Sequence, residues 1–340
     1  MKKTLLITRL SLPILLFSFT ASVLKGQLVL YEGFDYPLPG YIGGNTGSAG
    51  SASNNWITHS ITSGQTTTID LYAGSLNYLG SQNPIGNRIL LPGNNSTVSR
   101  DVNRAITTSS TVIYYSALIN VLDNTQLSTT GDYFMCIGQT AGGAAISVLG
   151  ARLSAKSVNS GTNYRLLIQN TSGTGSNYTE FTTDLSFGTT YLVVVKFDRT
   201  TIPTVATLWV NPSTLGSTEP GGSVTNSSSS SSFTAFASIC LRNAANTPKV
   251  EIDEIRIGES FASVTPVDVA APSASFNPSN GAIGVAIEVT PVISFDEPIL
   301  KTDGNPVTDG DLDALITFKK TDSGGDAVPF TATIMHQRKL

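Results

Sequence analysis

The chain has 340 residues, of which 13% are charged, and its formal net charge is −4. This length predicts about two domains once an N-terminal signal is set aside. A nucleic-acid-binding protein needs a basic face, so the sparse and slightly acidic charge excludes nucleic acid as a partner.

The first 26 residues have the layout of a secretory signal. Two lysines precede an apolar run, Leu5–Val23, which Arg9 and Pro13 interrupt. We expect cleavage at Gly26-Gln27, with Ala21-Ser22 as the alternative point. An uncleaved anchor helix would need about 20 largely unbroken apolar residues. We therefore expect an exported monomer, secreted or at a bacterial cell surface, with no membrane span in its mature chain.

Residues 27–262 have the pattern of an all-β domain. Short runs rich in Val, Ile, Thr, Tyr and Phe alternate with Gly, Asn, Ser and Pro, as in antiparallel strands. The run YLVVVKF is apolar on both faces and predicts a central, doubly covered strand. So many strands predict a large two-sheet jelly roll. The expected strands are Leu28–Glu32, Thr66–Leu71, Val112–Val121, Asp132–Gly138, Ala144–Leu153, Tyr164–Asn170, Thr190–Asp198, Ala206–Val210, Ser232–Arg242 and Val250–Ile257.

The segment Val250–Gly258, VEIDEIRIG, closes this region. Its alternation of apolar and polar residues ends at Ile252, is broken by Asp253 and Glu254, and resumes one residue out of phase at Ile255. A slip of one residue turns the following side chains to the other face unless the strand contains a bulge. We therefore predict a β-bulge here, with the three isoleucines of the segment in the core.

Residues 263–271, SVTPVDVAA, are richer in Pro, Val and Asp and predict a linker. A second β-rich unit follows over residues 272–334, with the turn sequences PSNGA and KTDGNP. Residues 335–340 show neither alternation nor turn chemistry and predict an unstructured tail. The strands expected in the second unit are Ala274–Asn277, Ile287–Val289, Val292–Phe295, Ala314–Lys319 and Phe330–Ile334.

The first unit resembles the concanavalin A-like lectin/glucanase superfamily in its laminin-G-like form. Three sets of motifs carry the resemblance across residues 27–262. The first is LYEGFDYP (Leu30–Pro37) with a Gly-rich stretch and Trp56, the second is YLVVVKFD with ATLWVNP (Ala206–Pro212) and Glu219-Pro220, and the third is VEIDEIRIG. The resemblance implies a jelly roll and membership among exported binders and enzymes.

The second unit resembles a bacterial Ig-like module of the surface-layer SbsA type. The segment Pro272–Ile299 carries this resemblance, together with TDGNPV and ITFKKTDSGGDAVPFTATI. The resemblance ends at Ile334, whereas a complete Ig-type sandwich has about 100 residues. We therefore expect an incomplete Ig-like domain in a chain that has been cut short.

The superfamily contains glycoside hydrolases, so the acidic strand needs a test. Its glucanases carry E-x-D-x-E or E-x-D-x-x-E, and retaining chemistry needs two carboxyl groups about 5–5.5 Å apart. Glu251 and Asp253 can share one face, but Glu254 falls on the other and Ile255 stands where a further carboxylate would be. We expect no catalysis from this strand.

A structural calcium ion is a second hypothesis for the same strand. Calcium takes six to eight oxygen ligands, carboxylates among them. The first and last strands of a jelly roll are often neighbours, which would bring Glu32 or Asp35 near Asp253, and such sites occur in the wider superfamily. The alternative is that Asp253 caps the bulge or pairs with Arg256. No other cofactor is required.

Aromatic side chains supply candidates for a sugar platform, because a flat ring offers an apolar face beside polar loops. The candidates are Trp56, Tyr72, Tyr78 and Tyr133, and ordinary packing is the alternative for each. Trp209, inside ATLWVNP, is expected in the core or packed against a sheet.

Cys136 and Cys240 both lie in apolar, strand-like runs. They are expected to be two buried thiols, and a bridge between neighbouring strands is the alternative that export permits. His59 is the only histidine before the tail, and one histidine does not make a metal site.

These observations favour an exported, non-catalytic binding or adhesion protein. Its lectin-like domain would recognise a polysaccharide, another glycan or a cell-surface protein, and the Ig-like unit would be a spacer. One alternative is an extracellular scaffold that binds protein partners. The other is a glucanase-like polysaccharide hydrolase.

Overall fold

The computed structural model describes residues 26–43, 51–53, 55–61, 68–93, 100–170, 177–227, 233–268, 272–286, 288–296, 299, 307–320 and 324–334. The predicted signal, apart from Gly26, and the predicted tail lie outside these residues. Within the described part of the chain, no helix is long and apolar enough to cross a membrane.

Ten strands form the first sheet, sheet A, which is antiparallel except where β2 meets β3. Nine of these strands lie side by side in one continuous order, and β1 lies outside that order because it pairs only with β17. The order of the other nine is β15 (Val224–Asn226), β14 (Val205–Val210), β13 (Thr190–Asp198), β8 (Val112–Val121), β17 (Val250–Gly258), β6 (Arg88–Leu91), β5 (Ile69–Tyr72), β2 (Tyr41–Ile42) and β3 (Ser51–Ser53), with β1 at Leu28–Glu32.

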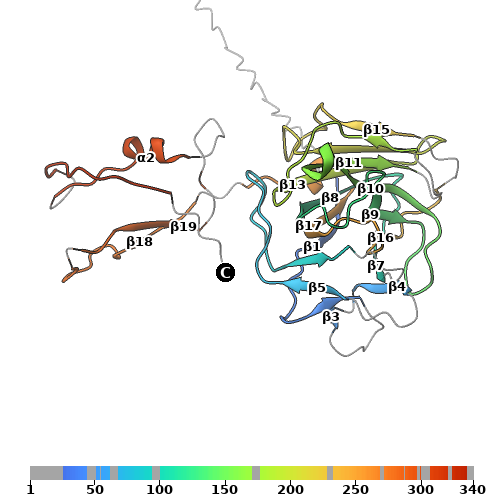
Figure 1. Cartoon of the computed structure of the whole chain (residues 1–340), viewed down its shortest axis with the longest axis horizontal. Coiled ribbons are helices and arrows are strands. Elements are labelled where there is room, and N and C mark those ends of the chain that lie inside the picture. The colour runs from blue at the N-terminus through green and yellow to red at the C-terminus, as the bar shows by residue number, and fades with distance from the viewer. Residues whose placement is uncertain are drawn as a thin grey trace, which may run out of the picture.

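Seven strands form the second sheet, sheet B, which is antiparallel throughout. The two sheets belong to one sandwich (Figure 1), which confirms the predicted all-β jelly-roll class. The order in sheet B is β12 (Thr179–Glu180), β11 (Asn163–Gln169), β10 (Leu149–Val158), β9 (Asp132–Gly138), β16 (Ser238–Leu241), β7 (Arg100–Ala105) and β4 (Ile57–Ile61), with the 3₁₀ turn η1 (Asn159–Gly161) between β10 and β11.

Apolar side chains from both sheets meet in one core. Val193 and Val195 of β13 face it, as do Leu153 of β10 and Ile239 of β16. Burying one such side chain stabilises the fold by about 1.5–3 kcal/mol. The alternation along each strand determines which side chains enter the core, because every second residue of a strand points to the same face.

A second apolar cluster covers the other face of sheet A. There Val194 and Trp209 pack with Phe261 and Val264 of the short helix α1 (Phe261–Val264). Ser260 and Ser263 form a capping box that starts this helix. β13 is therefore covered on both faces, as its sequence predicts, and Trp209 is buried as expected. Residues as far as Asp268 still bond to the sandwich, through Gly80.

The bulge predicted in β17 is present. The register of β17 against β8 shifts between Asp253 and Arg256, and Glu254 has a φ of +53°. The three isoleucines on either side of the slip are fully buried in the core. β1 lies beside β17, with Glu32 opposite Ile255, so the expected pairing of first and last strands is also confirmed.

Some predicted strand limits are wrong. The strand expected at Ala144–Leu153 is Leu149–Val158, because residues 139–148 form a loop whose Ile146 packs against the two cysteines. The strand expected at Ser232–Arg242 begins only at Ser238. The short strands β2, β4, β6 and β7 were not expected, since they lack long apolar runs.

The second unit contains a hairpin of β18 (Ala274–Asn277) and β19 (Val292–Phe295), both as predicted, and helix α2 (Asp309–Leu315). The strand expected at Ala314–Lys319 is wrong: α2, which a capping box of Thr308 and Asp311 starts, includes Ala314 and Leu315, and residues 316–319 form no strand. Phe330–Ile334 forms no strand, nor do the two described residues of 287–289. The Ig-like assignment remains a prediction.

Candidate functional site

A row of polar side chains crosses the outer face of sheet B. Its members are Asp101, Arg242, Tyr133, Arg152 and Gln169, called the polar row below. They come in this order from β7, the end of β16, β9, β10 and β11, which are adjacent in the sheet. Their neighbours along these strands face the core, so alternation places the row on the opposite side.

Strand register brings the row together. Arg152 lies directly opposite Gln169. The backbone N–H of Arg242 donates to the Phe134 carbonyl on β9 at 2.9 Å. The N–H of Asn243, one residue further, donates to the Asp101 carboxylate at 3.2 Å. Residues far apart in the sequence thus form one continuous band.

Tyr133 is the centre of the row. The guanidinium carbon of Arg242 lies 4.5 Å from the centroid of its ring, and that of Arg152 lies 4.7 Å away. Contacts of this kind are attractive and strengthen as water is excluded. Burial raises the pKa of Tyr133 above its usual value, so its phenol is neutral at physiological pH.

Two bulges shape the strands beneath the row. Between Gly150 and Leu153, β10 contains one residue more than β9 opposite it, and one step later β9 contains the extra residue. Ala151 has a φ of +47°, a conformation that costs a residue other than glycine energy. Bulges redirect side chains and often occur beside functional sites.

The strained backbone at Ala151 is held from below. The Tyr115 hydroxyl of sheet A donates to the Ala151 carbonyl at 2.8 Å. The Ala151 N–H donates to the side-chain oxygen of Asn170 at 3.1 Å. Arg152, which follows, is 95% buried, as its 5% exposure shows. Its guanidinium is therefore fixed rather than free to sample the solvent.

The acidic members of the site differ in exposure. Asp132, at the start of β9, forms an ion pair of 2.5 Å with Arg242, and both side chains remain partly exposed. Asp101 is more enclosed. Burial, opposed by Arg242, raises the pKa of Asp101 to about 6. Asp101 therefore takes up a proton as the pH falls through about 6, and the net charge of the site becomes more positive.

The loop of residues 139–148 borders the row on one side. Asn103 of β7 fixes it with two hydrogen bonds, accepting from the Gly142 N–H at 3.0 Å and donating to the Gly142 carbonyl at 2.9 Å. His59 of β4 lies 3.1 Å from the same asparagine. Burial lowers the pKa of His59 to about 4, so the ring is neutral at pH 7.

The four predicted platform aromatics do not form one surface. Tyr133 belongs to the polar row. Trp56 is buried in the core, where its indole N–H donates to Glu32 at 2.9 Å, so its place in a sugar platform was wrong. Tyr78 packs against the apolar cluster on sheet A. Tyr72 is 42% exposed at the end of β5, in sheet A rather than sheet B.

The predicted calcium ligands are not brought together. Glu32 points into the sandwich, where it accepts from Tyr36 at 2.6 Å and pairs with Arg104 of β7. Asp253 lies on the other face of sheet A, and Asp35 is exposed. No group of three His, Cys, Asp or Glu within the described ranges could hold a metal ion. The predicted set therefore does not fit calcium.

Asp253 and Glu254 instead accept hydrogen bonds from neighbouring segments of the chain and hold them against β17. Asp253 accepts from the Leu76 N–H at 2.8 Å. Glu254 accepts from the Tyr31 hydroxyl at 2.5 Å and pairs with Arg256 at 2.7 Å. Asp253 is fully buried.

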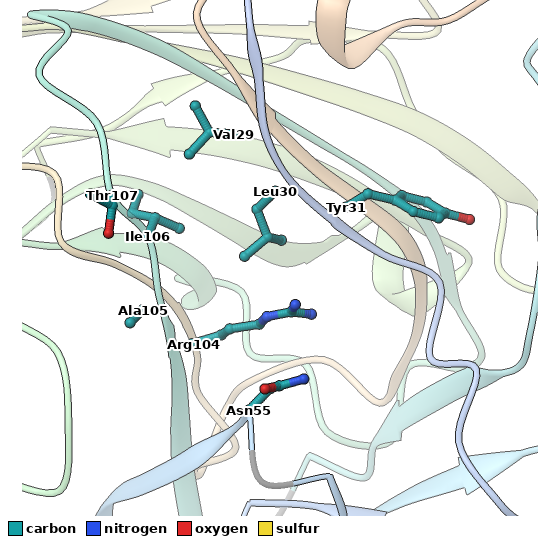
Figure 2. Close-up of a pocket in the computed structure, with 8 residues that line it drawn as sticks. All are labelled: Val29, Leu30, Tyr31, Asn55, Arg104, Ala105, Ile106 and Thr107. Atoms are coloured by element: carbon teal, nitrogen blue, oxygen red, sulfur yellow. The ribbon is translucent and has the colours of Figure 1, made fainter.

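A pocket of about 470 Å³ opens between β1 and the end of β7. Figure 2 shows Arg104 and Asn55 extending below the strand that carries Leu30. The Arg104 charge is already neutralised by Glu32, which is itself buried. We assign the pocket no ligand.

Sequence reasoning found Tyr133 but missed Asp101, Arg152, Arg242 and Gln169. A weak signal was present in β10, where Arg152, Ser154 and Lys156 alternate with core residues. Alternation shows that these side chains share a face. It does not show which strands lie beside β10, and that adjacency makes the site.

Comparisons with known proteins assign no family. No family model matches the chain, and no curated protein matches it. Among solved structures, the chain is similar to an endo-β-1,4-glucuronan lyase from the fungus Trichoderma reesei, with a TM-score of 0.41, 11% identity, and 71% of this chain and 99% of that one covered. It is also similar to the T. cruzi calreticulin globular domain, with a TM-score of 0.37, 10% identity, and coverage of 70% and 90%. For the carbohydrate recognition domain of Emp46p the TM-score is 0.31, the identity 12%, and the coverage 54% and 88%. Similarities this low assign no function, and the superfamily resemblance remains a prediction.

Proposed function

We propose that the protein is an exported, non-catalytic binding protein that recognises a glycan through the polar row of sheet B. The observation that carries this proposal is the Tyr133 ring between two guanidinium groups. A sugar presents hydroxyls and ring oxygens that need hydrogen-bond partners. The guanidinium, amide and phenol groups of the row supply such partners within one band, and the Tyr133 ring holds the two guanidinium groups in place.

The site is also pre-formed. Its side chains extend from strands rather than loops, and Arg152 and Gln169 are buried against their neighbours. Sites on rigid elements lose little conformational freedom when a ligand binds. This supports binding as the function.

The test is a binding screen of the purified protein against a polysaccharide panel, with titration calorimetry on each hit. Tyr133→Ala should weaken binding about tenfold or more, because both guanidinium groups then lose the ring that holds them in place. Tyr72→Ala, which removes an exposed tyrosine from sheet A, is the matched control and should have no effect. The reverse result would move the site to sheet A. Absence of all glycan binding would favour the protein-binding scaffold.

A polysaccharide hydrolase is the second candidate. Asp101, with its pKa of about 6, is in the range useful for a general acid, and Asp132 is a second carboxylate nearby. Reducing-end release from the bound polymer, compared between the native protein and Asp101→Asn, tests this. Release that depends on Asp101 would replace the non-catalytic proposal.

A further inference from the structure

Resting on the proposed function, we infer that the polar row selects a carboxylate-bearing polysaccharide, with Arg152 and Arg242 as the residues that recognise the acid. This specifies the ligand class that the glycan site takes. The inference depends on the geometry of the two arginines, on the charges around them and on the strain that positions one of them.

The two arginines share one ring. Both guanidinium carbons lie within 4.7 Å of the Tyr133 centroid, so both groups border the same ring and lie close enough together to face a single uronate unit bound over the row. A guanidinium is planar and donates two parallel hydrogen bonds to a carboxylate. Stacking on tyrosine orients the plane of each guanidinium before the ligand arrives.

The other basic residues of this face are differently placed. Lys156 and Arg165, on β10 and β11, both pair with Glu180, and Arg165 also pairs with Asp184. Their charge is therefore committed within the protein. Arg242 pairs with Asp132, but that pair is partly exposed and is worth little in water, so a ligand carboxylate can compete for the guanidinium.

The position of Arg152 is energetically unfavourable, both because of the backbone before it and because of its burial. It follows the strained Ala151 and is 5% exposed, although arginine is rarely buried so deeply. Strain at such a position persists only where the surroundings hold it, as Tyr115 and Asn170 do here. A buried guanidinium has already lost most of its water, which strengthens its attraction for an acid at the edge of the row.

Binding to polyuronates is the test. The native protein is titrated with polygalacturonate, alginate and hyaluronan, and with neutral galactan and dextran, at fixed ionic strength. We expect at least one polyuronate to bind and the neutral polymers to bind about tenfold more weakly or not at all. Arg242→Gln should lower the affinity about 10- to 100-fold, as loss of hydrogen bonds to a charged group does. Arg152→Lys, which retains the charge without the planar fork, should also weaken binding.

Controls separate the inference from general attraction and from the proposed function. Lys249→Ala removes one positive charge from an exposed ion pair outside the row and should leave binding unchanged. Equal weakening by Lys249→Ala, or equal binding of dextran sulfate, would overturn the inference. Binding of neutral polymers alone would overturn it but leave glycan binding in place, whereas no binding at all removes both. If Arg152→Lys does not fold, the partly exposed Arg242 decides the result.

Discussion

Asp253 shows at the scale of one residue how burial sets charge. Its side chain is fully buried, and this burial raises its pKa to about 8, although the N–H groups of Leu76 and Glu254 oppose the shift. The folded protein thus holds a proton that the unfolded chain releases near its ordinary pKa. By linkage, the contribution to stability is complete below pH 4 and is lost as the pH rises through 8.

Replacing Asp253 by Asn removes this titration. We expect the melting temperature of the native protein to fall between pH 5 and pH 9, and that of the Asp253→Asn variant to fall less, by about 2–4 °C for each kcal/mol involved. Thermal melts at five pH values check this. The difference between the two proteins is the relevant quantity, because Asp101 titrates in both. Parallel curves would contradict the assignment.

The two cysteines give a second prediction at this scale. They lie opposite each other on β9 and β16, both are free and buried, and burial raises the pKa of the Cys136 thiol well above its usual value. Since the thiolate is the reactive form, we expect no labelling by a thiol reagent in the native protein and two labelled thiols in denaturant. Two labels that appear only after reduction would show the cross-strand bridge instead.

At the scale of elements, Glu32 joins β1 of sheet A to β7 of sheet B. It accepts from the Phe34 N–H, Tyr36 and Trp56, and it pairs with Arg104 across the core edge. Both carboxylate oxygens of Glu32 already have partners inside the sandwich, which is why Glu32 does not lie with Asp253 in the predicted calcium set. The contact between the two sheets at this edge therefore depends on this single side chain.

We expect Glu32→Gln to lower the free energy of unfolding by about 3–5 kcal/mol, because one partner of a buried ion pair is left uncompensated. Glu180→Gln is the matched control, since it breaks a more exposed pair with Lys156 and should cost about 0–1 kcal/mol. Urea unfolding followed by fluorescence measures both. Equal losses would show that the Glu32 network adds no special stability.

The elements also show what the sequence could predict. Strands with apolar runs, such as β8, β9 and β13, were predicted with the limits they have, and the slip at Asp253 correctly predicted a bulge. The bulge at Ala151 left no such trace, because Gly150 and Ala151 are too small to mark a face. The polar row depends on register between strands whose residues lie up to about 140 positions apart, and periodicity within one strand contains no such information.

At the scale of the whole molecule, the two units differ in how well they are packed. Among the described residues of 272–334, Leu312 is the only buried apolar side chain, while Phe276 is 54% exposed and Ile283 is 95% exposed. Figure 1 shows the hairpin and α2 as a body apart from the sandwich. Exposed backbone with few buried contacts opens locally at low cost.

Limited proteolysis should therefore cut residues 269–334 before it cuts the sandwich. We expect a resistant fragment that ends after Asp268, the last described residue bonded to the sandwich, and mass spectrometry identifies its end. Early cleavage within β8 or β10 would show that the sandwich is the less stable unit.

The pairing of β1 with β17 affects when the sandwich can fold as the chain is made. Tyr31 and Glu254, which bond across that pair, are 223 positions apart in the chain. Contacts at such separation form slowly, because a long loop must close before they contribute. β17 lies between β8 and β6, so the two halves of sheet A cannot join until this last strand is available. A growing chain that lacks β17 therefore cannot complete the sandwich, which suits the proposed export in an unfolded state.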